Sequence, residues 1–187
     1  ATFLSPVVFA SSDKAPTASN NVAVGNSALG ANTTGASNTA VGANALDANT
    51  TASENTAVGK DSLGVTSTGN YNTGVGSGSL ASNTTASYNT AVGKSSLTYN
   101  TTGANNVSVG GNCLSANTTG SDNTSIGINA GSSNTTGGGN VFIGHDAGIT
   151  GSPGGNNTTS GNSVFLGDED MGSCHIQTDW TVASDQR

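Results

Sequence analysis

Basic residues are nearly absent from this sequence, and their scarcity excludes one large class of function. Four Lys and Arg stand against eleven Asp and Glu, which gives a net charge of −7 over 187 residues. A protein that binds nucleic acid needs a basic patch to neutralise phosphates, and this chain cannot assemble one. No apolar run approaches the roughly 20 residues that cross a bilayer, so we expect no membrane insertion. Good helix formers are also scarce, which disfavours a conventional α/β enzyme.

Cysteine is rare as well, and its spacing does not indicate a metal centre. Cys113 and Cys174 are the only two, with no Cys-x-x-Cys pair, so neither a zinc site nor an intrachain disulfide is favoured. We expect Cys113 to be a buried small residue. Cys174 and His175, close to Asp168, leave open a metal site on a threefold axis, but the preferred interpretation is a polar closing segment. We predict no metal and no cofactor.

Gly, Asn, Ser and Thr are abundant, and together they fill 105 of the 187 positions. Such a composition is typical of disorder, but a fixed internal period argues against it. A motif of the form Asn-x-x-Val-Gly, with Ile for Val in the last two copies, recurs every 17 residues without insertion or deletion. Its glycines are Gly25, Gly42, Gly59, Gly76, Gly93, Gly110, Gly127 and Gly144. Disorder requires no register, whereas stacked coils do.

The period predicts an all-β fold, a parallel β-solenoid or β-roll with one 17-residue coil per repeat. Each repeat holds two short apolar patches between turn residues, as two brief strands would. The asparagine that opens each motif should form a ladder that hydrogen-bonds along the stack and holds left-handed turns. We divide the chain into an entry segment (1–20), the eight-repeat roll (21–144), an irregular final coil (145–167) and a closing segment (168–187).

Alternation along a strand predicts which side chains face the core. We expect the larger apolar residue of each motif to point inward and the small residue before it to point outward. The inward column would be Val24, Val41, Val58, Val75, Val92, Val109, Ile126 and Ile143. The outward column would be Ala23, Ala40, Ala57, Gly74, Ala91, Ser108, Ser125 and Phe142. In the second patch, Leu29, Leu46, Leu63, Leu80, Leu97 and Leu114 each follow a small residue in the same way. Small outward residues let another backbone approach, so we predict an obligate oligomer, most simply a homotrimer.

Units such as Asn38–Gly42 (NTAVG) and Asn123–Gly127 (NTSIG) resemble the head repeats of trimeric autotransporter adhesins. That resemblance implies a left-handed parallel β-roll assembled from three chains. The final stretch, 164–187, resembles the junction before an intramolecular chaperone of the endosialidase type (peptidase S74-like), as found in phage tail fibres and tailspikes. The resemblance makes Ser184 the self-cleavage serine and Asp185 its supporting acid. The chaperone itself is absent from this sequence, so self-cleavage of this chain does not follow. Cyanobacterial phage tail fibres are similar in style.

These resemblances predict a structural and adhesive segment of a trimeric phage tail fibre, located on the extracellular virion. Its partners would be two further copies, other virion tail proteins and a host cell-surface polysaccharide. The alternative is the head of a bacterial trimeric autotransporter adhesin. An enzyme is not predicted, although a glycan depolymerase with carboxylates between subunits stays open.

The candidate receptor-binding residues are Tyr71, Tyr88 and Tyr99, because exposed aromatic rings stack on sugars. Tyr71 and Tyr88 share one position in neighbouring coils and should stack, while Tyr99 lies elsewhere in its coil. The Asn-Thr-Thr triplets match the N-glycosylation pattern and could also present an ice-binding hydroxyl array, but both interpretations are disfavoured. Lys60 and Lys94 are expected to be solvated, and His145 with Asp146 to lie in a turn. Phe142, Phe165 and Trp180 are expected to mark a change of architecture.

Overall fold

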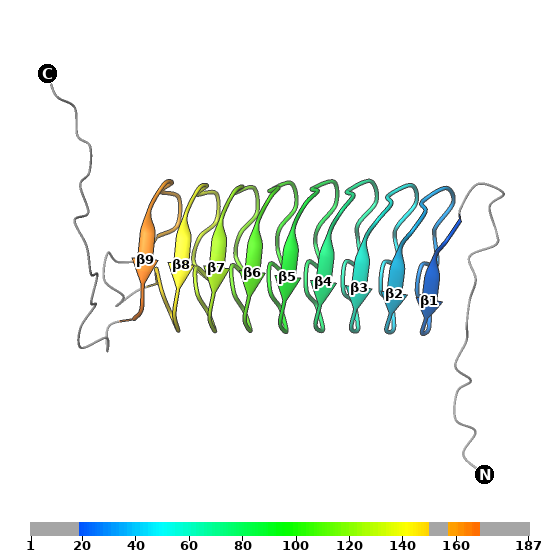
Figure 1. The fold of residues 1–187 in the computed structure, drawn as a ribbon, viewed down its shortest axis with the longest axis horizontal. Coiled ribbons are helices and arrows are strands. Elements are labelled where there is room, and N and C mark those ends of the chain that lie inside the picture. Colours follow the sequence, from blue (N-terminus) through cyan, green and yellow to red (C-terminus); the bar gives the residue numbers. More distant parts are fainter. Residues whose placement is uncertain (1–18, 150–156, 169–187) are drawn as a thin grey trace, which may run out of the picture.

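The structure is a computed structural model that describes residues 19–149 and 157–168. Nine three-residue strands form a single parallel sheet in which each strand pairs with the next along the chain (Figure 1). The strands are β1 (Val22–Val24), β2 (Thr39–Val41), β3 (Thr56–Val58), β4 (Thr73–Val75), β5 (Thr90–Val92), β6 (Val107–Val109), β7 (Thr124–Ile126), β8 (Val141–Ile143) and β9 (Val164–Leu166). The fold is a β-solenoid of about 17 residues per turn, which confirms the predicted class.

The register of the sheet follows the sequence repeat. From β1 to β8 each residue pairs with the one 17 positions later, as Ala40 does with Ala57. The longer step from β8 to β9 keeps the same pairing, with Phe142 opposite Phe165. The expectation of two strands per coil is wrong for the described residues, because the leucine patch of each coil forms turns instead.

The predicted asparagine ladder is present and joins every coil to its neighbours. The backbone amide of Asn38 donates to Oδ1 of Asn21 at 2.8 Å, and its side-chain Nδ2 donates to the carbonyl of Ala52 at 2.8 Å. The same two bonds recur at Asn55, Asn72, Asn89, Asn106 and Asn123. The residue before each of these asparagines has a left-handed backbone, which the ladder holds in place.

The motif glycine is required by backbone conformation and by close approach together. Gly93 has a φ of 133°, a region that residues with a side chain rarely adopt. A Cβ added there would lie 2.4 Å from the carbonyl oxygen of Gly110 in the next coil. The invariance of this position across the repeats therefore follows from the stacking of the coils.

The predicted assignment of the two strand faces is wrong. The small column is buried, with Ala40, Ala57 and Ala91 all at 0% exposure, while the valine column lies on the outside, with Ile126 at 45%. The coil is too thin for two rows of large side chains to meet across it, and the leucines already supply one such row. Opposite the leucines, the strand has room only for alanine, serine or glycine.

The leucine patch departs from the prediction for a different reason. Leu97 is fully buried, and so is Ser96 before it. Two successive residues can face the same side because Leu97 has a left-handed backbone (φ 51°), to which the alternation of an extended strand does not apply. Both columns therefore point into the core, where the hydroxyl of Ser96 meets that of Ser108 at 2.7 Å.

In the last two regular coils the large side chain lies on the strand and the small residue lies in the turn, which is the reverse of the other coils. Phe142 takes the place of the small strand residue and is fully buried, stacked on Phe165 with ring centroids 5.1 Å apart. Glycine takes the place of leucine at Gly131 and Gly148, where a Cβ would lie 2.7 and 2.4 Å from the Phe142 ring. The large side chain thus enters from the strand rather than from the turn, and the architecture continues unchanged.

Several expectations concern residues outside the described ranges. The entry segment (1–20) and the closing segment (168–187) lie almost wholly there. So do Ser184, Asp185, Cys174, His175 and Trp180.

Candidate functional site

The outer face of the sheet carries two rows of β-branched side chains, which follow from the alternation about the buried small column. We call the residues after that column the valine row: Val24, Val41, Val58, Val75, Val92, Val109, Ile126, Ile143 and, in β9, Leu166. Its members are half-buried or exposed, from Val58 at 36% to Ile126 at 45% among the exposed ones. The row before the small column consists of threonine in β2–β5 and β7 and of valine in β1, β6, β8 and β9, as in Thr56, Thr90 and Val107.

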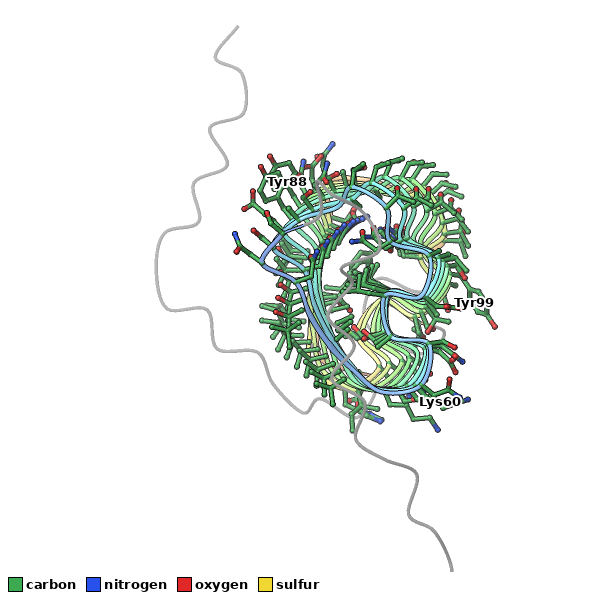
Figure 2. All side chains as sticks on the ribbon, turned by 90° about the vertical axis from the view of Figure 1, so that its right-hand side faces the viewer. Lys60, Tyr88 and Tyr99 are labelled. Carbon is green, nitrogen blue, oxygen red and sulfur yellow. The ribbon has the colours of Figure 1, made fainter. Side chains whose placement is uncertain are left out.

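Of the nine exposed valine and isoleucine side chains in the described ranges, seven lie on this sheet face. Nine strands at about 4.8 Å spacing make it roughly 38 Å long, and neither row carries a charged residue. Figure 2 shows the side chains of successive coils superimposed in regular rows around the coil, so that each row runs the length of the rod. A continuous aliphatic row on an otherwise polar surface is typical of an interface. Sequence analysis missed it because the row was assigned to the core.

The Asn-Thr-Thr triplets are occupied in holding the coils together. Nδ2 of Asn100 donates to Oδ1 of Asn83 at 3.0 Å and to the carbonyl of Gly103 at 2.9 Å, and the side chain is fully buried. The hydroxyl of the next residue, Thr101, donates to the carbonyl of Thr118 in the following coil. The folded coil therefore buries the amide nitrogens that glycosylation would modify. The second threonine of each triplet, such as Thr102, is exposed; the first is half-buried in the inner coils and exposed only at the two ends, at Thr33 and Thr158.

The three candidate receptor-binding tyrosines separate into a pair and a single residue. Tyr71 and Tyr88 stack with ring centroids 4.8 Å apart and an interplanar angle of 11°. Both are exposed, at 46% and 59%, and Tyr99 is exposed at 61%. Figure 2 places Tyr88 and Tyr99 at different corners of the coil, with Lys60 at a third. The structure thus brings two of the three together and leaves Tyr99 apart.

The tyrosine pair belongs to a ridge formed by the residues that precede the six ladder asparagines from Asn38 to Asn123. We call this the tyrosine ridge: Ser37, Glu54, Tyr71, Tyr88, Asn105 and Asp122. All six have left-handed backbones, with φ between 58° and 62°. The negative charge of Glu54 raises the pKa of Tyr71, because it disfavours the tyrosinate; the neighbouring Tyr88 and a hydrogen bond to Glu54 add to this. At the other side of the pair, Nδ2 of Asn105 donates to Oδ1 of Asp122 at 3.0 Å.

Charged side chains elsewhere form small exposed groups. Lys60 Nζ lies 2.8 Å from Asp61 Oδ2, and this hydrogen bond lowers the pKa of Asp61 and raises that of Lys60. His145 Nδ1 lies 3.2 Å from Asp168 Oδ2 and 3.5 Å from Asp146 Oδ2. The described ranges contain no group of three or more His, Cys, Asp or Glu residues arranged to hold a metal ion.

Cys113 is a buried small residue, as predicted. Its exposure is 0%, and its sulfur contacts the hydroxyl of Ser125 at 3.0 Å. Burial raises the pKa of its thiol, which disfavours the reactive thiolate.

Comparison with known proteins adds no relative to this description. No family model matches the chain, and no significant match is found among curated proteins or solved structures. Within residues 19–149 and 157–168, no helix is long and apolar enough to span a bilayer.

Proposed function

We propose that this chain is a structural and adhesive segment of a phage tail fibre, in which three copies pack as left-handed rolls around a common axis. The observation that carries the proposal is the valine row on the outer face of the sheet, half-buried or exposed, which continues without a gap from β1 to β9. The fibre would lie on the virion and contact a host cell-surface polysaccharide.

The chemistry of the sheet face supports lateral association. Both of its outer rows consist of β-branched residues apart from Leu166 in β9, and such side chains lose little conformational freedom when they are buried. Burying the remaining surface of one valine contributes on the order of 1 kcal/mol. Because the row repeats at every coil, this contribution accumulates along the rod, and an identical copy aligned in parallel offers a matching row.

The valine row, and not the column of small residues, is the surface on which a second copy would pack. The alanine column cannot admit a neighbouring chain, because it lies in the core. The valine row now takes that role, with larger side chains that leave more apolar surface in water on a single chain. Three chains around an axis would cover this surface on every copy.

A rod with one repeated surface suits adhesion through many weak contacts. Each copy in a trimer presents the same tyrosine ridge, and several fibres on one particle multiply the number of contacts. Avidity of this kind makes individually weak binding effective. The roles of Ser184 and Asp185 at a chaperone junction remain a prediction from the resemblance.

The mass of the native particle in solution tests the proposal. We expect three times 18.0 kDa for the full chain, and a variant with Val75→Lys and Val92→Lys should fall to 18.0 kDa with its β-sheet spectrum retained. Ser77→Lys is the matched control, because Lys60 and Lys94 occupy the same position in neighbouring coils; it should keep the trimer mass.

A milder pair, Val75→Thr and Val92→Thr, guards against loss of folding in the lysine variant. Threonine already occupies the other outer row of the same strands, so this variant should fold and associate more weakly. A well-folded wild-type particle of 18.0 kDa at all concentrations would overturn the proposal.

A further inference from the structure

The tyrosine ridge has a regular geometry that sets where a further ring could stack. The centroid separation of Tyr71 and Tyr88, 4.8 Å, equals the spacing between neighbouring strands. The two rings are nearly parallel, and each covers one face of the other. One coil further along the ridge stands Asn105, whose short side chain leaves no ring in that place. The stack of rings therefore ends at Tyr88, whose side chain is 59% exposed.

Polar groups border this end of the stack. Asn105 is exposed and uses its Nδ2 to hold Asp122 Oδ1 at 3.0 Å. That bond leaves Asn105 Oδ1 and the second carboxylate oxygen of Asp122 available as acceptors. A flat apolar face beside two acceptors matches the surface of a pyranose, which has C–H groups on its ring face and hydroxyl groups at its edge.

We propose that a pyranose ring binds at the end of the tyrosine stack, with its C–H face on Tyr88 and its hydroxyls donating to Asn105 and Asp122. This inference rests on the proposed glycan-contacting function and narrows it to one site per chain. Tyr71 acts as a positioning residue, because its ring supports Tyr88 from the opposite face. Tyr99, at another corner of the coil, takes no part (Figure 2).

The charges along the ridge select the class of sugar. Carboxylates stand on both sides of the stack, at Glu54 and Asp122, and the ridge itself carries no basic residue. A uronic or sialic acid would bring a third carboxylate to this place without a cation to balance it. The site therefore favours neutral hexopyranosides and N-acetylamino sugars over acidic ones.

Saturation-transfer NMR on the full chain, followed by titration, tests the inference. The probes are methyl β-glucopyranoside, methyl β-galactopyranoside, N-acetylglucosamine and methyl β-glucuronide. We expect millimolar binding of at least one neutral probe and at least threefold weaker binding of the glucuronide. Tyr88→Asn should weaken the affinity for the neutral probe by about 3- to 10-fold, the loss expected when one aromatic stacking partner is removed.

The repeat supplies matched substitutions. Asparagine stands at the Tyr88 position in a neighbouring coil (Asn105), and serine stands at the Tyr99 position in another (Ser82), so neither residue type is foreign to its place. Tyr99→Ser should leave binding unchanged, and Asp122→Asn should reduce the discrimination against the glucuronide, because it removes the carboxylate next to the proposed site. Absence of binding by every neutral probe, equal loss with Tyr99→Ser, or preference for the glucuronide would overturn the inference.

The native mass of the same samples separates the two proposals. A trimer that binds no neutral probe contradicts the site and leaves the fibre standing. A monomer that binds a neutral probe through Tyr88 contradicts the fibre and leaves the site standing.

Discussion

Thr66 interrupts the ladder formed by the asparagines of the Asn-Thr-Thr triplets, and replacing it with asparagine should stabilise the chain. In the neighbouring coils and on to Asn134, Nδ2 donates to Oδ1 of the preceding coil, as Asn49 does to Asn32 at 2.8 Å. Threonine has no amide, so Oδ1 of Asn49 receives no donor, and the buried hydroxyl of Thr66 has no partner either. Within the described residues these are two of four buried side-chain polar atoms without a hydrogen bond.

The magnitude of the effect follows from these unpaired atoms. A buried polar atom without a partner costs about 1–3 kcal/mol, and a new internal hydrogen bond contributes about 0.5–1.5 kcal/mol. In Thr66→Asn, the new Nδ2 would donate to Asn49 and to the carbonyl of Gly69, and the new Oδ1 would accept from Asn83. Asparagine fits this position in the other coils without strain. We therefore expect a gain of about 1–3 kcal/mol in the free energy of unfolding.

Urea denaturation followed by circular dichroism measures this gain. Wild type and variant are compared at equal protomer concentration, because association would otherwise change the apparent stability. Thr68→Asn, at an exposed position of the same coil, is the control and should stay within about 0.5 kcal/mol of wild type. The reverse change, Asn100→Thr, removes bonds to Asn83 and Asn117 and should destabilise by a similar amount. An unchanged or lowered stability of Thr66→Asn would refute the reasoning.

Three further predictions concern the core, the thiol and the ridge. Phe142→Ala should destabilise the chain by about 3–5 kcal/mol, and Gly131→Leu alone should also destabilise it. The double variant should recover much of the lost stability, because it restores the pairing of leucine with alanine found in the other coils. Additive losses of stability in urea denaturation would contradict this. In a Cys174→Ser background, a thiol reagent should modify Cys113 only as fast as the chain unfolds, and rapid labelling of the native chain would count against its burial. In an alkaline titration followed by tyrosinate absorbance, Tyr71 should ionise at higher pH than an ordinary tyrosine, and Glu54→Gln should lower its pKa. Because the pKa of Tyr71 is higher in the folded chain than in the unfolded chain, the unfolded chain loses its proton first, and the free energy of unfolding falls as the pH rises between the two pKa values. If Glu54→Gln leaves the titration of Tyr71 unchanged, Glu54 is not the cause of the raised pKa.

The stacking of the coils could be predicted because the repeat fixes it directly. Eight motif glycines at a constant spacing require coils of equal length, and a conserved asparagine at one position of each coil requires a ladder. The pairing of Tyr71 with Tyr88 follows from the same arithmetic. Contacts between neighbouring coils can therefore be predicted by pairing residues that lie one 17-residue period apart.

The arrangement within a coil could not be predicted in the same way. Alternation correctly places Ala91 and Val92 on opposite faces, but it does not tell which face is the core. It fails altogether at Ser96 and Leu97, where a left-handed residue turns both side chains inward.

One feature of the sequence does indicate which face of the strand points into the core. In the last regular coils, phenylalanine replaces alanine on the strand at Phe142, while glycine replaces leucine at Gly131 and Gly148. When a larger side chain in one column is matched by a smaller one in the other, the two columns fill the same volume of the core. They do share it, because the Phe142 ring occupies the volume next to both glycines. The alanine column therefore had to be internal and the valine row external.

The central claim is that other copies of the chain cover the valine row, and cysteine accessibility tests it most directly. In a background with Cys113→Ser and Cys174→Ser, single cysteines are placed at Val92, at Ala91 and at Lys94, and their reaction with a thiol reagent is followed over a range of protein concentrations. The account predicts that Lys94→Cys reacts rapidly throughout, that Ala91→Cys reacts only on unfolding, and that Val92→Cys is protected except where dilution separates the copies. Reaction of Val92→Cys as fast as Lys94→Cys at every concentration would contradict it.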